Sequence, residues 1–123
     1  MGEKSLVWVG QSKKDLLRFP DDVVDAIGFA LGEVQNGRMP KSAKVLQGFG
    51  GASVMEIVAD DSSGTFRAVY TVKFEDATYV LHCFQKKSTQ GIKTSTQDMD
   101  LVRARLAWAE EISNEWKKSQ GKK

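Results

Sequence analysis

A short basic segment at the end of an apolar run carries the side chains of this sequence that are best suited to chemistry on an anion. Residues 80–87 read VLHCFQKK, where the apolar run holds the only histidine and the only cysteine of the chain, His82 and Cys83, and ends in Lys86 and Lys87. Lysine supplies a compact positive charge, and histidine titrates near neutral pH. These residue types indicate an anion-binding site with a candidate proton acceptor.

Arg67 is a second candidate, because it is a charge within a strand pattern. In TFRAVYTVKF, residues 65–74, successive side chains point to opposite faces, so Arg67 and Tyr70 lie on different faces and Tyr70 is expected to pack. If a hairpin closes around residues 61–64, the numbers of facing residues sum to about 123 to 125, which puts Glu56 nearly opposite Arg67. Glu56 then forms either an ordinary cross-strand ion pair or a carboxylate support for an anion-binding arginine.

The basic end of residues 80–87 lies close to Arg67 if a second hairpin closes around residues 75–77. The third strand then runs antiparallel beside the Arg67 strand, and its basic end emerges next to Arg67. His82 either shares the face of Arg67 or is a satisfied histidine of the sheet, whereas Cys83 alternates onto the opposite face and is expected in the core.

Such a cluster suits a phosphodiester, because arginine grips phosphate oxygens in pairs and lysine adds charge. It would also stabilise the charge that develops when an RNA 2′-hydroxyl attacks its own phosphate. Lys44 and Lys93 would extend the positive surface. The competing interpretation is a solvated basic strand end or a general nucleic-acid contact.

Other site classes are disfavoured. One cysteine and one histidine exclude an internal disulfide framework and argue against a cysteine- or histidine-based metal site. Neither a metal nor a small-molecule cofactor is expected. The glycine-rich stretch GFGG at residues 48–51 precedes a strand and lacks the GxxxxGK[ST] pattern of a phosphate-binding loop. Its glycines are expected to allow a tight approach to the sheet.

The whole chain reads as one ordinary globular domain. Its 123 residues are 41% hydrophobic and 28% charged with a net charge of +2, which permits anionic partners without demanding them. We expect a domain over residues 1–116 and a flexible basic tail over residues 117–123. The first residues, MGEKSLVWVG, lack the apolar core of a signal peptide, and no stretch reaches the length of a membrane span, so we expect a cytoplasmic protein.

The elements that position the candidates follow from hydrophobic periodicity and turn residues. A cap at Ser12, a helix-starting Pro20 and a possible capping box at Ser95 and Asp98 mark three helix starts. Residues 38–51 are expected to form a loop. The sequence predicts an α+β fold of order β-α-α-β-β-β-α, in which an N-terminal helical hairpin and a C-terminal helix pack on a small antiparallel sheet. We expect strands over residues 5–9, 54–59, 66–74 and 78–84, and helices over 12–17, 20–35 and 95–116.

Three segments in this order resemble the RelE/ParE toxin superfamily, and within it the phage-derived, HigB-like branch. They are KVLQGFGGASVMEI, FRAVYTV and YVLHCFQKKSTQGIKTSTQDMDLVRARL, and the resemblance covers residues 5–112. It implies a RelE-like fold and the role of toxin in a type II toxin–antitoxin module. It further implies a ribosome-dependent endoribonuclease that cuts mRNA without a metal and inhibits translation. The partners it implies are an antitoxin with a helix-turn-helix domain and mRNA on the ribosome.

The resemblance also suggests residue roles. Arg67 matches the arginine on the central strand of these toxins, and Lys86 and Lys87 match the basic residues after the last strand. His82 lies in a matching segment and is the candidate proton acceptor. The remaining basic positions expected to contact RNA or the ribosome are Lys44, Lys93 and Arg103.

One departure from RelE leaves the activity open. RelE carries catalytic lysines on the strand before the arginine strand, whereas residues 54–57 read VMEI here, and Glu56 receives no catalytic role. The ParE branch shares the fold and inhibits DNA gyrase instead, so the fold alone does not decide the target. A gyrase inhibitor and an inactive phage-derived binding module therefore stand as alternatives to the endoribonuclease.

Overall fold

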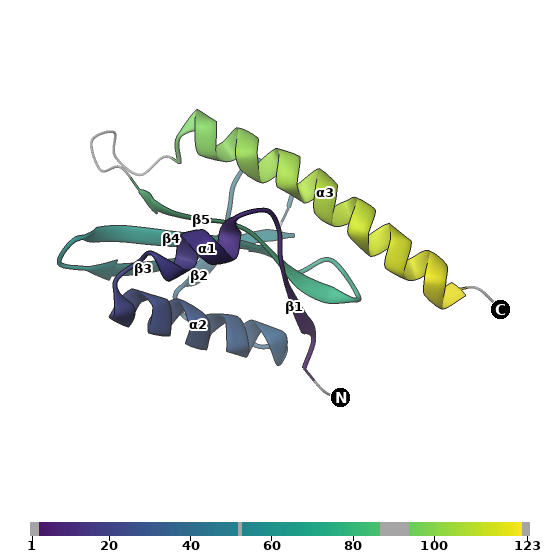
Figure 1. The fold of residues 1–123 in the computed structure, drawn as a ribbon, viewed down its shortest axis with the longest axis horizontal. Helices are drawn as coiled ribbons and strands as arrows, with labels where there is room; N and C mark the ends of the chain where they lie inside the picture. Colours follow the sequence, from purple (N-terminus) through teal and green to yellow (C-terminus); the bar gives the residue numbers. More distant parts are fainter. Residues whose placement is uncertain (1–2, 52, 87–93, 122–123) are drawn as a thin grey trace.

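The computed structural model describes residues 3–51, 53–86 and 94–121, which fold into a sheet with helices on both faces (Figure 1). Helices α1 and α2 cover one face of the sheet, and α3 crosses the other (Figure 1). The strands are β1 (Ser5–Trp8), β2 (Ala43–Val45), β3 (Val54–Asp61), β4 (Gly64–Thr71) and β5 (Ala77–Lys86), and the helices are α1 (Ser12–Leu17), α2 (Asp21–Gln35) and α3 (Thr96–Gly121).

The predicted α+β class is confirmed, with two corrections to the sheet. The five strands of the described residues lie in the order β1-β5-β4-β3-β2, with β2 to β5 antiparallel and β1 parallel to β5, so the sheet is mixed. The prediction of a loop over residues 38–51 missed β2, because three residues are too few to show a strand period. Pairing with β3 defines this strand.

The helix boundaries follow local chemistry. Gln11 occupies the N-cap of α1, and Ser12, predicted as the cap, instead donates its hydroxyl to the Val80 carbonyl at 3.1 Å and ties α1 to the sheet. The predicted cap of α3 at Ser95 is confirmed, because Ser95 Oγ accepts from the Asp98 N–H at 3.1 Å. The Asp98 carboxylate returns the contact to the Ser95 hydroxyl, which donates to it at 2.8 Å, and not to the backbone N–H of a complete capping box.

The C-terminal helix continues past the predicted end at Trp116. It runs to Gly121, because NEWKKSQ, residues 114–120, contains no proline or glycine that would stop it. Residues 117–121 are therefore helical and not a separate tail, and residues 122–123 lie outside the described part. No helix among the described residues is both long enough and apolar enough to cross a lipid bilayer.

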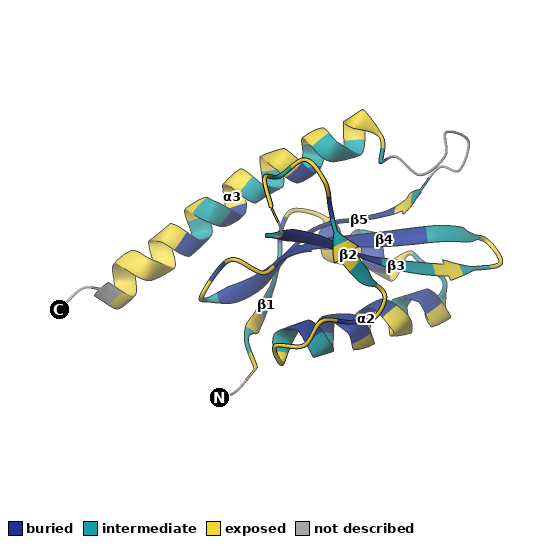
Figure 2. Ribbon diagram, turned by 180° about the vertical axis from the view of Figure 1, so that it is seen from behind, coloured by how far each residue is buried: buried dark blue, intermediate teal, exposed yellow. Residues whose placement is uncertain are grey.

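Two hydrophobic layers, one on each side of the sheet, hold the helices in place. The burial map in Figure 2 shows buried strands between helices whose outer sides are exposed. Tyr70 and Cys83 are buried in the layer beneath α1 and α2, as their strand alternation predicts. Val69 and Val102 belong to the layer beneath α3. The α3 face of the sheet is therefore the face that carries Arg67.

A bulge in β5 places one further polar residue on this face. Val69 pairs with His82 and Tyr70 pairs with Val80, so Leu81 is an extra residue on β5. Bulges re-aim side chains in this way. As a result both Leu81 and His82 face α3: Leu81 joins the hydrophobic layer, and His82 contacts the helix.

Candidate anion-binding site between the sheet and the C-terminal helix

The centre of the candidate site is a buried ion pair. Arg67 Nη1 on β4 lies 2.8 Å from Glu56 Oε1 on β3, and the two residues are only 6% and 3% exposed. The predicted register is confirmed, since facing residues are Val58 and Arg67 or Glu56 and Val69, so the two charges lie diagonally on one face. Arg67 Nε is buried without a hydrogen-bond partner among the described residues. A donor is thereby left for a ligand.

Lys44 joins this pair from the edge of the sheet. It lies opposite Glu56 in the β2–β3 register, and its Nζ is 4.0 Å from Glu56 Oε2. The two oxygens of Glu56 thus face two different cations. The Lys44 side chain is 57% exposed, so its charge is available to a ligand from solvent.

A cavity of about 590 Å³ opens above the ion pair, between the β2 region and the start of α3. The described lining contains three cations, Lys44, Arg67 and Arg103, and one carboxylate, that of Glu56. The electrostatic balance of the described lining therefore favours an anion. The full described lining is Lys44, Val45, Leu46, Gln47, Glu56, Arg67, Thr94, Thr96, Met99 and Arg103.

Arg103 is held in a defined orientation at the α3 wall of this cavity. Its Nη1 lies 3.2 Å from Asp100 Oδ1, and its Cζ lies 5.7 Å from the centre of the Phe49 ring. Phe49 belongs to the GFGG loop, which we expected to approach the sheet. The loop instead approaches α3. The position of Gly48 shows this, since a Cβ there would lie 3.2 Å from Met99 Cε.

His82 lies on the same face as Arg67 but beneath the surface. Its Nε2 is 2.7 Å from Asp98 Oδ1 on α3, and its ring stacks on Phe84 with a 4.7 Å centroid separation. It is 6% exposed and does not line the cavity, and its Nδ1 has no partner within the described ranges. Of the two alternatives for His82, the face shared with Arg67 is confirmed, whereas the satisfied histidine is not, because only Nε2 is bonded among the described residues.

The basic strand end lies close to the centre of the site. Lys86 is the last residue of β5 and pairs with Thr65, two positions along β4 from Arg67. Partial burial, and after it the positive charge of Arg67, lower the pKa of Lys86. Lys87 and Lys93, the other predicted basic residues of this segment, lie outside the described residues.

Several contributors to the site were not predicted. Asp98 was interpreted only as part of a helix cap, and nothing in the sequence pairs it with His82. Met99 was expected only as part of the helix over residues 95–116, and Leu46 lay in the expected loop over residues 38–51.

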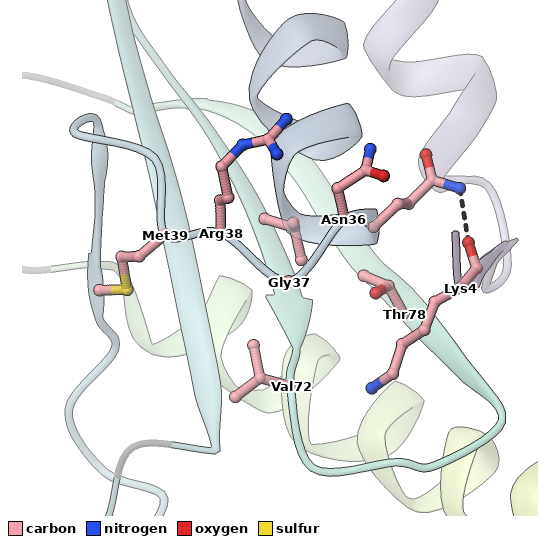
Figure 3. A pocket seen from close by; sticks show the side chains of 9 residues that line it. Lys4, Asn36, Gly37, Arg38, Met39, Val72 and Thr78 are labelled. Carbon is pink, nitrogen blue, oxygen red and sulfur yellow. Dashed lines mark hydrogen bonds between the residues drawn. The ribbon is translucent and has the colours of Figure 1, made fainter. Parts of the chain in front are cut away.

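A second hollow lies at the end of α2 and collects none of the predicted residues (Figure 3). It has a volume of about 560 Å³, and the side chains of Met39 and Val72 stand at it. Its cations are engaged elsewhere: Lys4 donates to the Phe74 carbonyl at 2.8 Å, and Arg38 lies 3.9 Å from a Glu33 oxygen. This hollow therefore offers less positive charge to an anion than the cavity above Arg67.

Comparison with known proteins supports the fold. The model of a phage-derived protein family described as Gp49-like matches residues 14–107. A chain in the crystal structure of the toxin–antitoxin complex RelBE2 from Mycobacterium tuberculosis is 19% identical with a TM-score of 0.49, over 68% of this chain and 99% of that one. A mutant of the E. coli toxin RelE in the free state is 18% identical with a TM-score of 0.51, over 73% of this chain and 90% of that one. The RelE likeness shows a RelE-like fold. No curated protein matches the sequence significantly.

Proposed function

The chain belongs to the family of phage-derived Gp49-like proteins, and we propose that it is the toxin of a type II toxin–antitoxin module that cuts mRNA on the ribosome. The observation that carries the proposal is the Arg67 guanidinium, buried against Glu56 at the floor of a cavity whose other charged lining residues, Lys44 and Arg103, are cations. The RelE-like fold supports the same class of protein but does not decide the reaction.

The proposed reaction is transfer within the RNA backbone. The 2′ oxygen forms a new bond to the adjacent phosphorus, and the bond from phosphorus to the 5′ oxygen of the next nucleotide breaks. The 2′ proton passes to a base, and the departing 5′ oxygen takes up a proton. Arg67 and Lys86 would stabilise the negative charge that builds on the phosphate oxygens, with Lys87 as a further cation.

His82 is the proposed proton acceptor. Because Asp98 contacts Nε2, a neutral His82 that donates from Nε2 carries its lone pair on Nδ1. That atom is buried in the free protein, so the proposal requires His82 to become accessible when RNA binds. Asp98 would then act on the reaction only through His82.

The proposed partners follow from the proposed role. They are mRNA in the ribosomal A site and a cognate antitoxin with a helix-turn-helix domain, and the proposed location is the cytoplasm. Lys44, Arg103 and Lys93 are proposed to contact RNA or the ribosome through their positive charge.

A cell-free translation reaction with one defined mRNA tests this function. The wild-type chain is expected to cut the message within translated codons only when ribosomes are present, and Arg67→Ala is expected to leave it intact. Arg38→Ala, which removes a cation from the opposite hollow, is the matched control and should cut like wild type. Intact mRNA together with gyrase-dependent DNA breaks would favour the gyrase inhibitor. Inactivity against both targets would favour a binding module.

A further inference from the structure

The cavity above Arg67 has two chemically different ends, and we propose that it is a nucleotide subsite in which one RNA base stacks on the guanidinium of Arg103. The choice of RNA rests on the proposed function, whereas the stacking site rests on the geometry of the cavity. Phosphate would lie at the Arg67 and Lys44 end, and the base would lie at the α3 wall.

Arg103 presents a flat surface that is already oriented. Asp100 contacts one terminal nitrogen at 3.2 Å, and the Phe49 ring lies under the guanidinium at 5.7 Å. The side chain is nevertheless 53% exposed, so it is available to a ligand from solvent, and the proposed base would stack on the face away from Phe49. Proteins recognise unstacked RNA bases by stacking them on such planar guanidinium groups as well as on aromatic rings.

The rest of the lining matches a base attached to a phosphate. Leu46 and Met99 provide apolar contact on the α3 side of the cavity, and Thr94 and Gln47 provide donors and acceptors for base edges. The volume of about 590 Å³ falls within the range of roughly 300–1,000 Å³ typical of small-molecule sites. A simple anion would use the charged end and leave the apolar end unfilled.

Gly48 keeps this wall open. Its φ is +105°, and a Cβ at this position would lie 3.2 Å from Met99 Cε and 3.9 Å from Arg103 Nη2. A side chain here would press on Met99 and come into van der Waals contact with Arg103, the two residues of the proposed stacking wall. A glycine at position 48 therefore lets the loop place Phe49 under Arg103 without crowding the wall formed by Met99 and Arg103.

The test measures binding of adenosine 3′-monophosphate and of inorganic phosphate to the purified full chain. The wild-type chain is expected to bind the nucleotide about tenfold more tightly than phosphate, since base stacking contributes at that scale. Arg103→Lys keeps the charge and removes the plane, so it should abolish this preference and leave phosphate binding unchanged. Arg38→Lys makes the same change on another surface and should retain the preference.

Equal affinity of the wild-type chain for the two ligands, or absence of binding of both, would overturn the subsite. So would an Arg103→Lys variant that keeps the preference for the nucleotide. These outcomes are separate from failure of the nuclease: a preference that depends on Arg103 in a protein that cuts no RNA leaves the subsite standing and rejects only the reaction. Intact cleavage with no role for Arg103 in nucleotide binding rejects only the subsite.

Discussion

Arg67 and Glu56 form a buried ion pair even though they do not face each other in the register of β3 and β4. Arg67 Nη1 lies 2.8 Å from Glu56 Oε1, while the residue directly opposite Glu56 is Val69. The diagonal contact keeps both charges on the α3 face and leaves the second oxygen of Glu56 toward Lys44 at 4.0 Å. A phosphate bound at the proposed site would therefore share the Arg67 guanidinium with the Glu56 carboxylate, which orients that guanidinium.

Removing the Glu56 carboxylate is expected to lower the stability of the fold. Glu56→Ala leaves a buried guanidinium without its partner, and we expect it to lower the free energy of unfolding by about 3–5 kcal/mol in urea denaturation. Glu110→Ala is the matched control, because Glu110 forms a 2.7 Å ion pair with Lys73 at the surface, worth about 0–1 kcal/mol. Equal losses in the two variants would contradict the structural role of the buried pair.

The contact between His82 and Asp98 should hold the start of α3 against the sheet. Asp98→Ala removes both this contact and the contact of Asp98 with the Ser95 hydroxyl, whereas Ser95→Ala removes only the contacts of the Ser95 hydroxyl, a cap worth about 1 kcal/mol. We expect faster amide hydrogen exchange in the first turn of α3 for Asp98→Ala than for Ser95→Ala, and a lower rate of RNA cleavage. Identical exchange in the two variants would mean that the contact with His82 adds nothing.

Stability should fall at alkaline pH, in part because of two buried acids, Cys83 and Tyr70. Burial raises the pKa of Cys83 from 9.0 to about 12 and that of Tyr70 from 10.0 to about 12. The unfolded chain loses these protons near the ordinary values, whereas the folded chain keeps them. Their contribution is therefore complete below about pH 9 and is lost progressively as the pH rises toward about 12.

Urea denaturation across neutral and alkaline pH measures this effect. The double variant Cys83→Ala with Tyr70→Phe should lose less stability per pH unit above about pH 9 than wild type does, whatever its stability at neutral pH. An alkaline slope as steep as that of wild type would show that these two groups do not cause the effect.

Replacing Gly48 and Gly28 by alanine should change the stability of the fold in opposite directions. Gly48→Ala forces a side chain into a φ of +105° and toward Met99, so we expect a loss of about 1–3 kcal/mol and weaker nucleotide binding. Gly28 lies within α2 with no atom within 4 Å of an added Cβ, so Gly28→Ala should stabilise by about 0.5–1 kcal/mol. Thermal or urea denaturation of both variants measures the change in the free energy of unfolding. A change of the same sign in the two variants would contradict the assigned strain at Gly48.

Local patterns predicted much of the fold. The strand alternation placed Arg67 and Tyr70 on opposite faces, the hairpin signals gave the register that brings Glu56 to Arg67, and the cap at Ser95 located the start of α3. Each of these depends on neighbours in the chain or on one tight turn. For that reason the pattern of residue types was sufficient to predict these features.

The features that the sequence did not predict depend on contacts between distant segments. β2 is a strand only because β3 lies beside it, and the extra residue Leu81 depends on how β5 fits β4. The contact of Asp98 with His82 joins α3 to β5, and the approach of Gly48 to Met99 joins a loop to α3. Residue spacing along the chain carries no direct information on such contacts.

The most direct test of the central claim maps mRNA 5′ ends in cells shortly after expression of the chain begins. Wild type is compared with Arg67→Ala, with Arg38→Ala as the control, and with Glu56→Leu plus Arg67→Met, which replaces the buried pair by apolar side chains of similar size. The account predicts new ends within translated codons for wild type and Arg38→Ala, and none for either Arg67 variant when soluble protein accumulates. Growth arrest with intact mRNA, or unchanged cleavage by both Arg67 variants, would contradict it.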